Sequence, residues 1–219
     1  MTVQLFGLAR SVYTRIARLA LEEKGVAYAL HEVEIFGPDG VPAEHMQRHP
    51  FGRIPAFEHD GLRLYETAAI TRYVDEAFAG PPLQPADAAR RARMTQIIGV
   101  LDAYAYRPMV WGVVVPRMRP RPGDDKPDEA KIAEAMAAAA RALDALDALV
   151  ALSGGAPHLL GPDLTLADLH AWPVLSCFAF APEGAALLAR HAALQRWLQT
   201  MQQRPSVQRT RSVFDAPHK

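Results

Sequence analysis

The chain has 219 residues, half of them apolar, and its 24 basic side chains are balanced by 24 acidic ones. A chain of this length can bury a core unaided, and its single cysteine excludes a disulfide framework or a cysteine-based metal cluster. Zero net charge argues against a protein that binds nucleic acid or an anionic membrane. Residues 109–115 are too short an apolar run to span a membrane, and residues 1–10 lack the pattern of a signal peptide. We therefore expect a cytoplasmic protein that acts on a small molecule.

The composition of the chain changes near residue 80. Short alternating apolar segments mix with helical ones before this point, and the chain reads almost entirely as helix after it. A proline-rich stretch lies at the change and favours a stiff linker. The sequence predicts an α/β domain over residues 1–80, a linker over 81–85 and an all-helical domain over 86–219.

The first eighty residues predict a small four-stranded mixed sheet with helices on its faces. In chain order the expected elements are a strand at 3–6, a helix from 12 to Gly25, a strand at 28–35, strands at 54–58 and 62–65, and a helix at 66–78. Asp60-Gly61 between two apolar runs is a strong hairpin signal. The order is a right-handed βαβ unit followed by ββα.

The second part of the chain predicts a helical bundle. Apolar residues at helical spacing indicate helices over 86–115, 131–152, 166–178 and 187–203, the first interrupted softly at Pro108. Thr165 and Asp168 have the spacing of a capping box, which we interpret as a folding signal.

Ser11 and Thr14 stand at the start of the first helix, where a dithiol protein would carry two cysteines. Two hydroxyls exclude dithiol exchange. Ser11 is either an ordinary helix cap or the donor of a hydrogen bond to a thiolate that the helix dipole also stabilises. The residues alone leave both interpretations open.

Ile54-Pro55 opens the third strand. A proline at this place fits an edge strand or a tight turn. It also fits a cis peptide that turns the backbone of Ile54 outward, so that its N–H and C=O can pair with a bound peptide.

Glu66 and Thr67 begin the helix that follows the hairpin. Both residue types are ordinary helix caps. The corner equally suits an amino-acid zwitterion, because the Thr67 hydroxyl and free N–H groups can hold a carboxylate while Glu66 holds an ammonium group.

Together these motifs resemble the cytosolic glutathione transferase family, in particular its serine-type members of the bacterial theta-like and phi-like kind. The resemblance covers nearly the whole chain. It rests on residues 5–7, 11, 14–15 and 21–26, on His49-Pro50-Phe51-Gly52-Arg53-Ile54-Pro55-Ala56-Phe57, on Tyr65-Glu66-Thr67-Ala68-Ala69-Ile70 and on Leu164-Thr165-Leu166-Ala167-Asp168. It implies a thioredoxin-like first domain that binds glutathione and a helical second domain that shapes the site for an electrophile.

The resemblance also implies a role for each motif. Ser11 matches the serine that holds the glutathione thiolate, with Tyr13 and Thr14 as alternatives. Ile54 and the cis residue Pro55 match the segment that pairs with the cysteinyl part, and Glu66 and Thr67 match the γ-glutamyl site. The family often binds the glycine end through His or Lys after the second strand, but residues 37–42 hold no basic residue. Arg53 or His45 is expected to replace it.

The aromatic stretch at residues 104–111 is either bundle core or, as the resemblance implies, part of the electrophile site. The candidates for that site are Tyr104, Tyr106, Arg107, Val110 and Trp111. Aromatic groups with one arginine would suit a planar, weakly anionic substrate.

The remaining features have mostly structural interpretations. His45 and His49 have the spacing of metal ligands on a helix but lack a third partner, so we expect no metal. The run Arg117, Arg119, Arg121 predicts a solvated loop or a basic rim, and Cys177 predicts a buried small side chain.

We therefore expect a homodimeric glutathione transferase whose subunits meet between the 66–78 helix of one chain and residues 90–97 of the other. The alternatives are a glutathione-dependent isomerase, dehalogenase or ether-cleaving lyase, and a non-catalytic ligand-binding protein.

Overall fold

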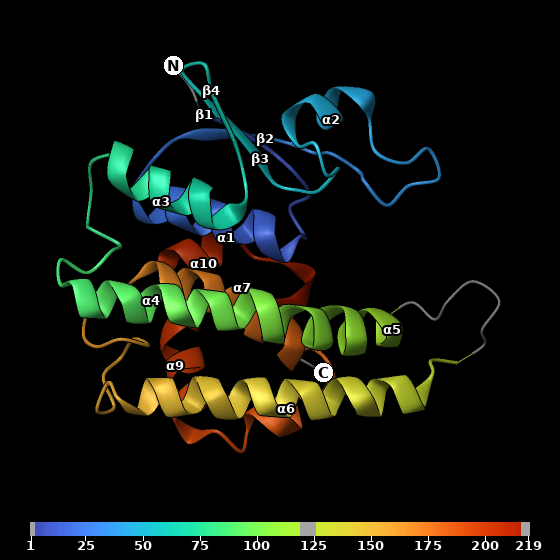
Figure 1. Cartoon of the computed structure of the whole chain (residues 1–219), viewed down its shortest axis with the longest axis vertical. Coiled ribbons are helices and arrows are strands. Elements are labelled where there is room, and N and C mark those ends of the chain that lie inside the picture. Colours follow the sequence, from blue (N-terminus) through green and yellow to red (C-terminus); the bar gives the residue numbers. More distant parts are fainter. Residues whose placement is uncertain (1–2, 119–125, 216–219) are drawn as a thin grey trace. The chain divides into compact units, whose positions relative to one another are not determined.

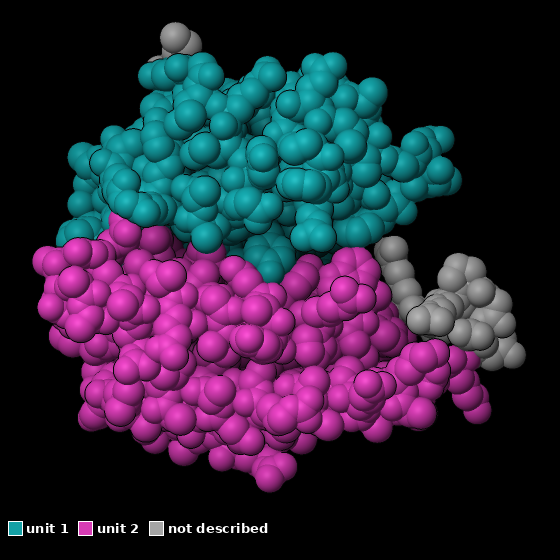
Figure 2. Space-filling view, in the orientation of Figure 1, with its two compact units in different colours: residues 1–83, 205–213 teal, residues 84–204, 214–219 magenta. Residues whose placement is uncertain are grey.

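A computed structural model describes residues 3–118 and 126–215. The chain forms two compact units, coloured separately in Figure 2. Unit 1 comprises Met1–Leu83 and Pro205–Val213, and unit 2 comprises Gln84–Arg204 and Phe214–Lys219. Residues 205–213 thus belong with the first unit, whereas the sequence predicts them as part of the helical domain.

Unit 1 has the thioredoxin-like order that the sequence predicts. Its elements are β1 (Val3–Phe6), α1 (Val12–Glu23), β2 (Tyr28–His31), α2 (Ala43–Arg48), β3 (Ala56–His59), β4 (Leu62–Tyr65), α3 (Thr67–Ala77) and α10 (Pro205–Arg209). The four strands have the order β2-β1-β3-β4, with β1 parallel to β2 and antiparallel to β3. Helices α1 and α3 pack side by side (Figure 1). Leu5, Ile16, Phe57 and Ile70 are fully buried in this core.

Two details of unit 1 differ from the sequence-based prediction. Strand β2 ends at His31 instead of residue 35, because its regular pairing with β1 stops at Phe6, the last residue of β1. The short helix α2 was not predicted, since six residues are too few to establish an apolar period.

Unit 2 is a helical bundle, as expected. Its elements are α4 (Ala88–Val100), π-helical turns at Leu101–Ala105 and Arg107–Val114, α5 (Val115–Met118), α6 (Glu129–Ala151), α7 (Leu166–Ala179), α8 (Pro182–Leu188) and α9 (Ala192–Gln202). A short 3₁₀ turn, Val213–Asp215, ends the described chain. The core of unit 2 fully buries Leu101, Met109 and Leu143.

Pro108 changes the helix in which it lies more than the sequence analysis expected. A proline has no N–H donor, and its ring clashes with the carbonyl four residues earlier. On both sides of Pro108 the helix widens, so that the N–H of Tyr106 bonds the carbonyl of Leu101 and that of Val115 bonds Val110. The predicted continuous helix therefore contains two π-helical turns.

The helix predicted at 187–203 is wrong in its first turn. The N–H groups of Arg190 and His191 close a turn on Leu187 and Leu188, which ends α8, and α9 begins only at Ala192. The capping box at the start of α7 is confirmed: Asp168 accepts a 2.8 Å hydrogen bond from the backbone N–H of Thr165. Cys177 is buried, as predicted.

Candidate active site

The strand register brings the three motifs of unit 1 to one edge of the sheet. Phe6, the last residue of β1, pairs with Ala56, the first of β3, and Ala56 pairs with Tyr65, the last of β4. The segment after β1 leads to Ser11, the segment before β3 is Ile54-Pro55, and Glu66 follows β4. The topology therefore collects a helix start, a proline turn and a second helix start at the same edge.

Ser11 is the N-cap of α1. Its backbone is extended (φ −69°, ψ 133°), and its Oγ accepts a hydrogen bond from the N–H of Thr14 at 3.4 Å. A serine hydroxyl has one donor and two acceptor positions. The cap uses an acceptor position, so the O–H donor remains available for an anion while the residue caps the helix.

Two glutamates anchor the loop between β1 and Ser11. Glu32 Oε1 accepts a hydrogen bond from the N–H of Ala9 at 3.1 Å, and Glu34 pairs with Arg10 at 2.8 Å. The pKa of Glu34 lies below its usual value, because the backbone N–H of Phe36 and the guanidinium of Arg10 both stabilise its carboxylate. The loop after β2 thereby supports the start of α1.

The two alternatives to Ser11 lie differently. Tyr13 is half-buried on α1, whereas Thr14 is fully buried. The Thr14 hydroxyl lies against Gly7, at a place where a Cβ on Gly7 would collide with it. Of the two hydroxyls at the ends of the motif, only that of Ser11 is not fully enclosed by protein.

The peptide bond between Ile54 and Pro55 is cis, as predicted. In the part of the chain that the structure describes, no hydrogen bond is recorded from the backbone N–H or C=O of Ile54. Arg53 exposes its side chain, and its carbonyl lies 2.7 Å from Nε2 of His45. His45 is only 2% exposed, so the structure places it behind this segment.

Glu66 has an unusual backbone conformation, with φ +68° and ψ 111°. Residues other than glycine rarely adopt a positive φ, and such strain clusters at functional sites. Its carbonyl accepts from the N–H groups of Ala69 and Ile70, and its side chain makes no capping bond. Thr67, the first residue of α3, is 6% exposed. The first N–H groups of the helix remain unused by any cap, which suits an anion.

His49 lies beside the candidate site residue Glu66, and the sequence did not single it out as a candidate for binding. It is 3% exposed, and its ring lies 5.0 Å from that of Tyr65 and 6.2 Å from that of Phe51. Burial lowers its pKa, while the negative charge of Glu66 acts in the opposite direction. His49 is the first residue of the proline motif, but its spacing from His45 suggested only a role as a metal ligand.

The five candidates for the electrophile site lie in the π-helical segment of unit 2. Tyr104 is 67% exposed and Trp111 43%, Arg107 is exposed, Tyr106 is half-buried and Val110 is buried. Trp111 Nε1 donates a 3.0 Å hydrogen bond to the hydroxyl of Tyr106, five residues earlier. The π-helical register accounts for this contact, because it aligns residues five positions apart. The contact of these residues with a substrate stays a prediction.

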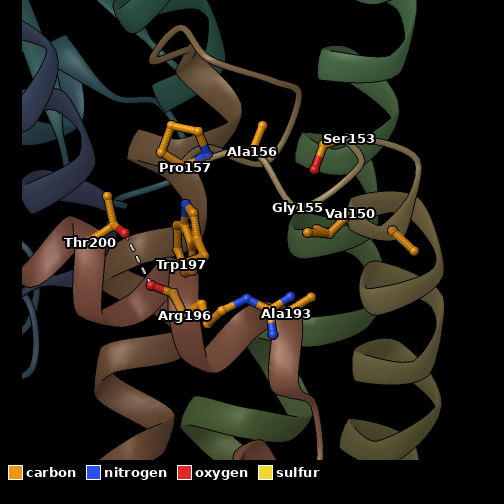
Figure 3. Close-up of a pocket in the computed structure, with 10 residues that line it drawn as sticks. Val150, Ser153, Gly155, Ala156, Pro157, Ala193, Arg196, Trp197 and Thr200 are labelled. Carbon is orange, nitrogen blue, oxygen red and sulfur yellow. Dashed lines mark hydrogen bonds between the residues drawn. The ribbon is translucent and has the colours of Figure 1, made fainter.

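A pocket of about 480 Å³ in unit 2 contains none of these candidates (Figure 3). The loop after α6 and helix α9 line it. The lining residues are Val150, Ala151, Ser153, Gly155, Ala156, Pro157, Ala193, Arg196, Trp197 and Thr200. Trp197 is held by a bond from its Nε1 to Asp168, and Arg196 is the only charged residue among the ten. The ten lining residues include no acid–base pair and no nucleophile beside a base, so they do not indicate a catalytic site.

The remaining expectations concern charge, metals and membranes. Arg117 pairs with Glu129 and Glu183 at 2.6 Å each. The two carboxylates stabilise the charged guanidinium, so they raise its pKa and balance its positive charge. Arg119 and Arg121 lie outside the described residues. Within residues 3–118 and 126–215, no group of three potential metal ligands is found. No helix in the same ranges is long and apolar enough to cross a membrane.

Comparisons with known proteins identify both parts of the chain. Residues 1–76 match the family "Glutathione S-transferase, N-terminal domain" and residues 106–205 match "Glutathione S-transferase, C-terminal domain". A probable glutathione S-transferase GSTF1 of Oryza sativa subsp. japonica is 28% identical, and the match covers 97% of this chain and 96% of the relative.

Two solved structures are also similar over nearly their whole length. Glutathione S-transferase III in its apo form has a TM-score of 0.81 at 26% identity and is covered completely. Glutathione S-transferase-I, bound with lactoylglutathione, has a TM-score of 0.80 at 25% identity over 96% of this chain and 98% of that one.

Proposed function

This chain belongs to the glutathione S-transferase family, and on that basis we propose that it is a serine-type, phi-like enzyme that conjugates glutathione to small hydrophobic electrophiles. Its similarity to glutathione S-transferase F6 and glutathione S-transferase F7 of Arabidopsis thaliana supports the phi-like part of this proposal. The observation that carries the reaction is the register Phe6–Ala56–Tyr65, because it gathers Ser11, Ile54 and Glu66 at one edge of the sheet.

Ser11 would stabilise the thiolate of glutathione. A thiol with a pKa of about 8.5 is only a few per cent ionised at neutral pH. Lowering that pKa by about two requires about 2.7 kcal/mol of differential stabilisation. One hydrogen bond from the Ser11 hydroxyl to the sulfur contributes about 1.5–3 kcal/mol, and the N-terminus of the twelve-residue helix α1 adds about 0.3–1 kcal/mol. The two together are of the size required.

The remaining site residues would hold the peptide around this sulfur. The backbone N–H and C=O of Ile54 pair with the cysteinyl part, beside Pro55. Glu66 binds the γ-glutamyl ammonium, and the Thr67 hydroxyl with the first N–H groups of α3 binds the carboxylate. Arg53, whose side chain is exposed, is our candidate for the glycine carboxylate.

In the reaction, the thiol proton leaves to solvent and the thiolate attacks an electrophilic carbon, from which the leaving group departs with its electron pair. Holding both reactants together supplies much of the acceleration. Tyr104, Tyr106, Arg107, Val110 and Trp111 stay our candidates for binding the electrophile.

The assembly and location are proposals of the same kind. We propose a homodimer in which α3 of one subunit meets residues 90–97 of the other, in a cytoplasmic enzyme. Sedimentation of the purified chain would test the dimer, and a monomer at micromolar concentration would contradict it.

Calorimetry with glutathione, followed by product analysis with an aryl halide, tests the function. We expect binding and a thioether product with release of halide. Absence of glutathione binding by the native protein would contradict the proposal altogether. Binding without a thioether product would favour a ligand-binding protein or one of the alternative glutathione-dependent enzymes. Conversion of an isomerisable substrate with full recovery of glutathione would favour the isomerase.

A further inference from the structure

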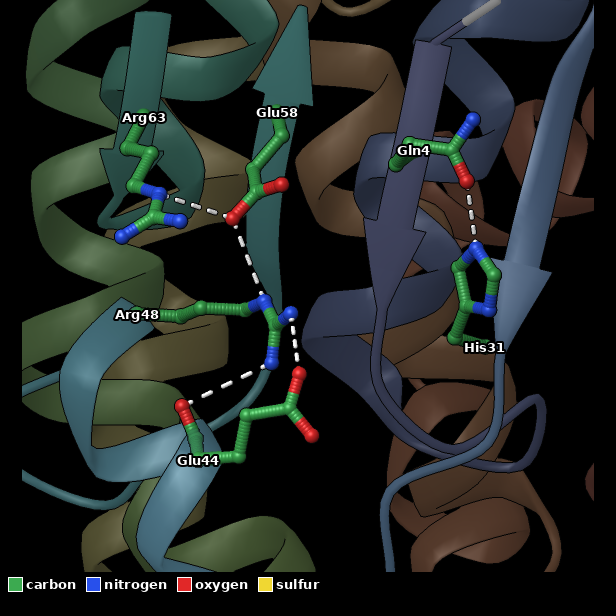
Figure 4. Close-up of polar contacts among 6 residues, drawn as sticks. All are labelled: Gln4, His31, Glu44, Arg48, Glu58 and Arg63. Carbon is green, nitrogen blue, oxygen red and sulfur yellow. Dashed lines mark hydrogen bonds and ion pairs between the residues drawn. The ribbon is translucent and has the colours of Figure 1, made fainter. Parts of the chain in front are cut away.

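Helix α2 is fixed to the sheet by Arg48. The guanidinium of Arg48 bonds Glu44 on its own helix at 2.6 Å and Glu58 on β3 at 3.1 Å, and it lies 4.1 Å from the centre of the Phe6 ring. Figure 4 shows Arg48 between these two carboxylates, with Arg63 on the far side of Glu58. Phe6 and Glu58 both belong to the sheet, so α2 is a stable base for the other residues that it carries.

His45 lies on this helix and reaches the segment before β3. The residue is only 2% exposed, and its Nε2 lies 2.7 Å from the carbonyl oxygen of Arg53. A carbonyl can only accept, so Nε2 carries the proton and donates. Its other ring nitrogen, Nδ1, is buried and has no hydrogen-bond partner among the described residues. Among the described residues, the hydrogen bond to Arg53 is therefore the one hydrogen bond recorded for this imidazole.

The carbonyl of Arg53 and the N–H of Ile54 belong to the same peptide unit. This unit is trans, since the cis bond lies one residue later. In a planar trans peptide the C=O and N–H point in opposite directions. A bond that holds the Arg53 oxygen toward His45 therefore fixes the Ile54 N–H to point away from α2.

We propose that His45 is a positioning residue of the glutathione site: through the Arg53 carbonyl it orients the Ile54 N–H that pairs with the cysteinyl part of the ligand. The inference rests on the proposed function, in which Ile54 makes that contact. It gives His45 a role behind the segment, in place of the direct contact with the glycine carboxylate for which the sequence offered His45 as an alternative to Arg53.

Two substitutions separate the hydrogen bond from packing. His45→Phe keeps a ring of similar size but removes the donor. His45→Gln keeps a donor near the place of Nε2 and loses only Nδ1, which has no partner to lose. In the full-length chain we expect His45→Phe to weaken binding of S-methylglutathione about five- to tenfold, the effect of one ordinary hydrogen bond. His45→Gln should bind within about twofold of the native protein.

The kinetic readout distinguishes positioning from a general structural defect. We expect the KM for glutathione to rise with the Kd in His45→Phe, whereas kcat at saturating glutathione and the pKa of the bound thiol stay unchanged. A Phe variant that is folded and binds like the native protein would overturn the inference, as would equal losses in the Phe and Gln variants. Failure of the native protein to bind S-methylglutathione or glutathione would instead refute the proposed function.

A measurement on the native protein covers the case in which His45→Phe does not fold. Nitrogen NMR of the histidine rings should show the His45 proton on Nε2, both without and with S-methylglutathione. The Ile54 amide resonance should shift when the ligand is added. A proton on Nδ1, or an Ile54 amide that does not respond to bound ligand, would overturn the inference.

Discussion

Replacing Asp168 with Asn is expected to destabilise unit 2 by about 3–6 kcal/mol. Asp168 is fully buried, and its carboxylate accepts four hydrogen bonds. Oδ1 accepts from the N–H of Leu159 at 2.8 Å and from Nε1 of Trp197 at 2.9 Å. Oδ2 accepts from the N–H and the hydroxyl of Thr165 at 2.8 and 2.9 Å. The carboxylate thus joins the start of α7 to two other parts of the unit.

The magnitude follows from what an amide can still accept. Asn keeps one oxygen, so it serves one pair of donors, and its NH₂ group faces the other pair. Two bonds to a charged acceptor are lost, and each contributes about 1.5–3 kcal/mol. Since a typical domain is stable by about 5–15 kcal/mol, the variant approaches the threshold of folding.

Urea unfolding followed by circular dichroism at neutral pH measures this loss. Trp197→Phe is the matched control: it removes one donor, keeps the carboxylate, and should cost about 1–3 kcal/mol. The reasoning fails if Asp168→Asn lowers the free energy of unfolding by less than about 1 kcal/mol, or by no more than Trp197→Phe.

Three further predictions concern other sites. Lys24→Met should lower the free energy of unfolding in urea by about 3–5 kcal/mol, because it removes the ammonium group that lies 3.1 Å from the buried carboxylate of Asp75. Adding Asp75→Leu should recover part of that loss. A double variant less stable than Lys24→Met alone would contradict this. Glu66→Gly should be more stable than Glu66→Ala by about 1 kcal/mol in thermal unfolding, because glycine tolerates the positive φ at this position. Both variants should bind glutathione weakly. Equal stability of the two would argue against backbone strain at residue 66. Burial lowers the pKa of His170 to about 3, so the unfolded chain takes up a proton near pH 6.5 and the folded chain does not. Stability should therefore fall as the pH drops below about 6.5, by up to about 1.4 kcal/mol per pH unit, and His170→Gln should reduce that slope; an identical slope in the variant would refute the assignment.

Much of unit 1 is predictable because its signals are local. Asp60-Gly61 specifies the hairpin, Gly25 ends the first helix region with φ +65°, and apolar alternation marks the short strands. The end of β2 was not predictable, because it depends on where the neighbouring strand stops. The break between α8 and α9 was missed because apolar spacing continues through residues 189–191 while the backbone turns.

The candidate site was predictable to a smaller extent. The motifs around Ser11, Ile54 and Glu66 were visible, but their meeting at one sheet edge follows from the register of β1, β3 and β4. The positive φ of Glu66 leaves no mark in residue type. The bond between His45 and the Arg53 carbonyl joins a side chain to a backbone group eight residues away, and backbone groups are the same in every sequence.

The pKa of the thiol of bound glutathione tests the central claim most directly. Ultraviolet absorbance of the thiolate, titrated against pH, should give a pKa about two below the free value of about 8.5 in the native protein. Ser11→Ala should raise it by about 1 to 2, whereas Thr14→Val, which alters a buried hydroxyl against Gly7, should leave it unchanged. An unaltered titration in Ser11→Ala, or a shift confined to Thr14→Val, would contradict the assignment of Ser11.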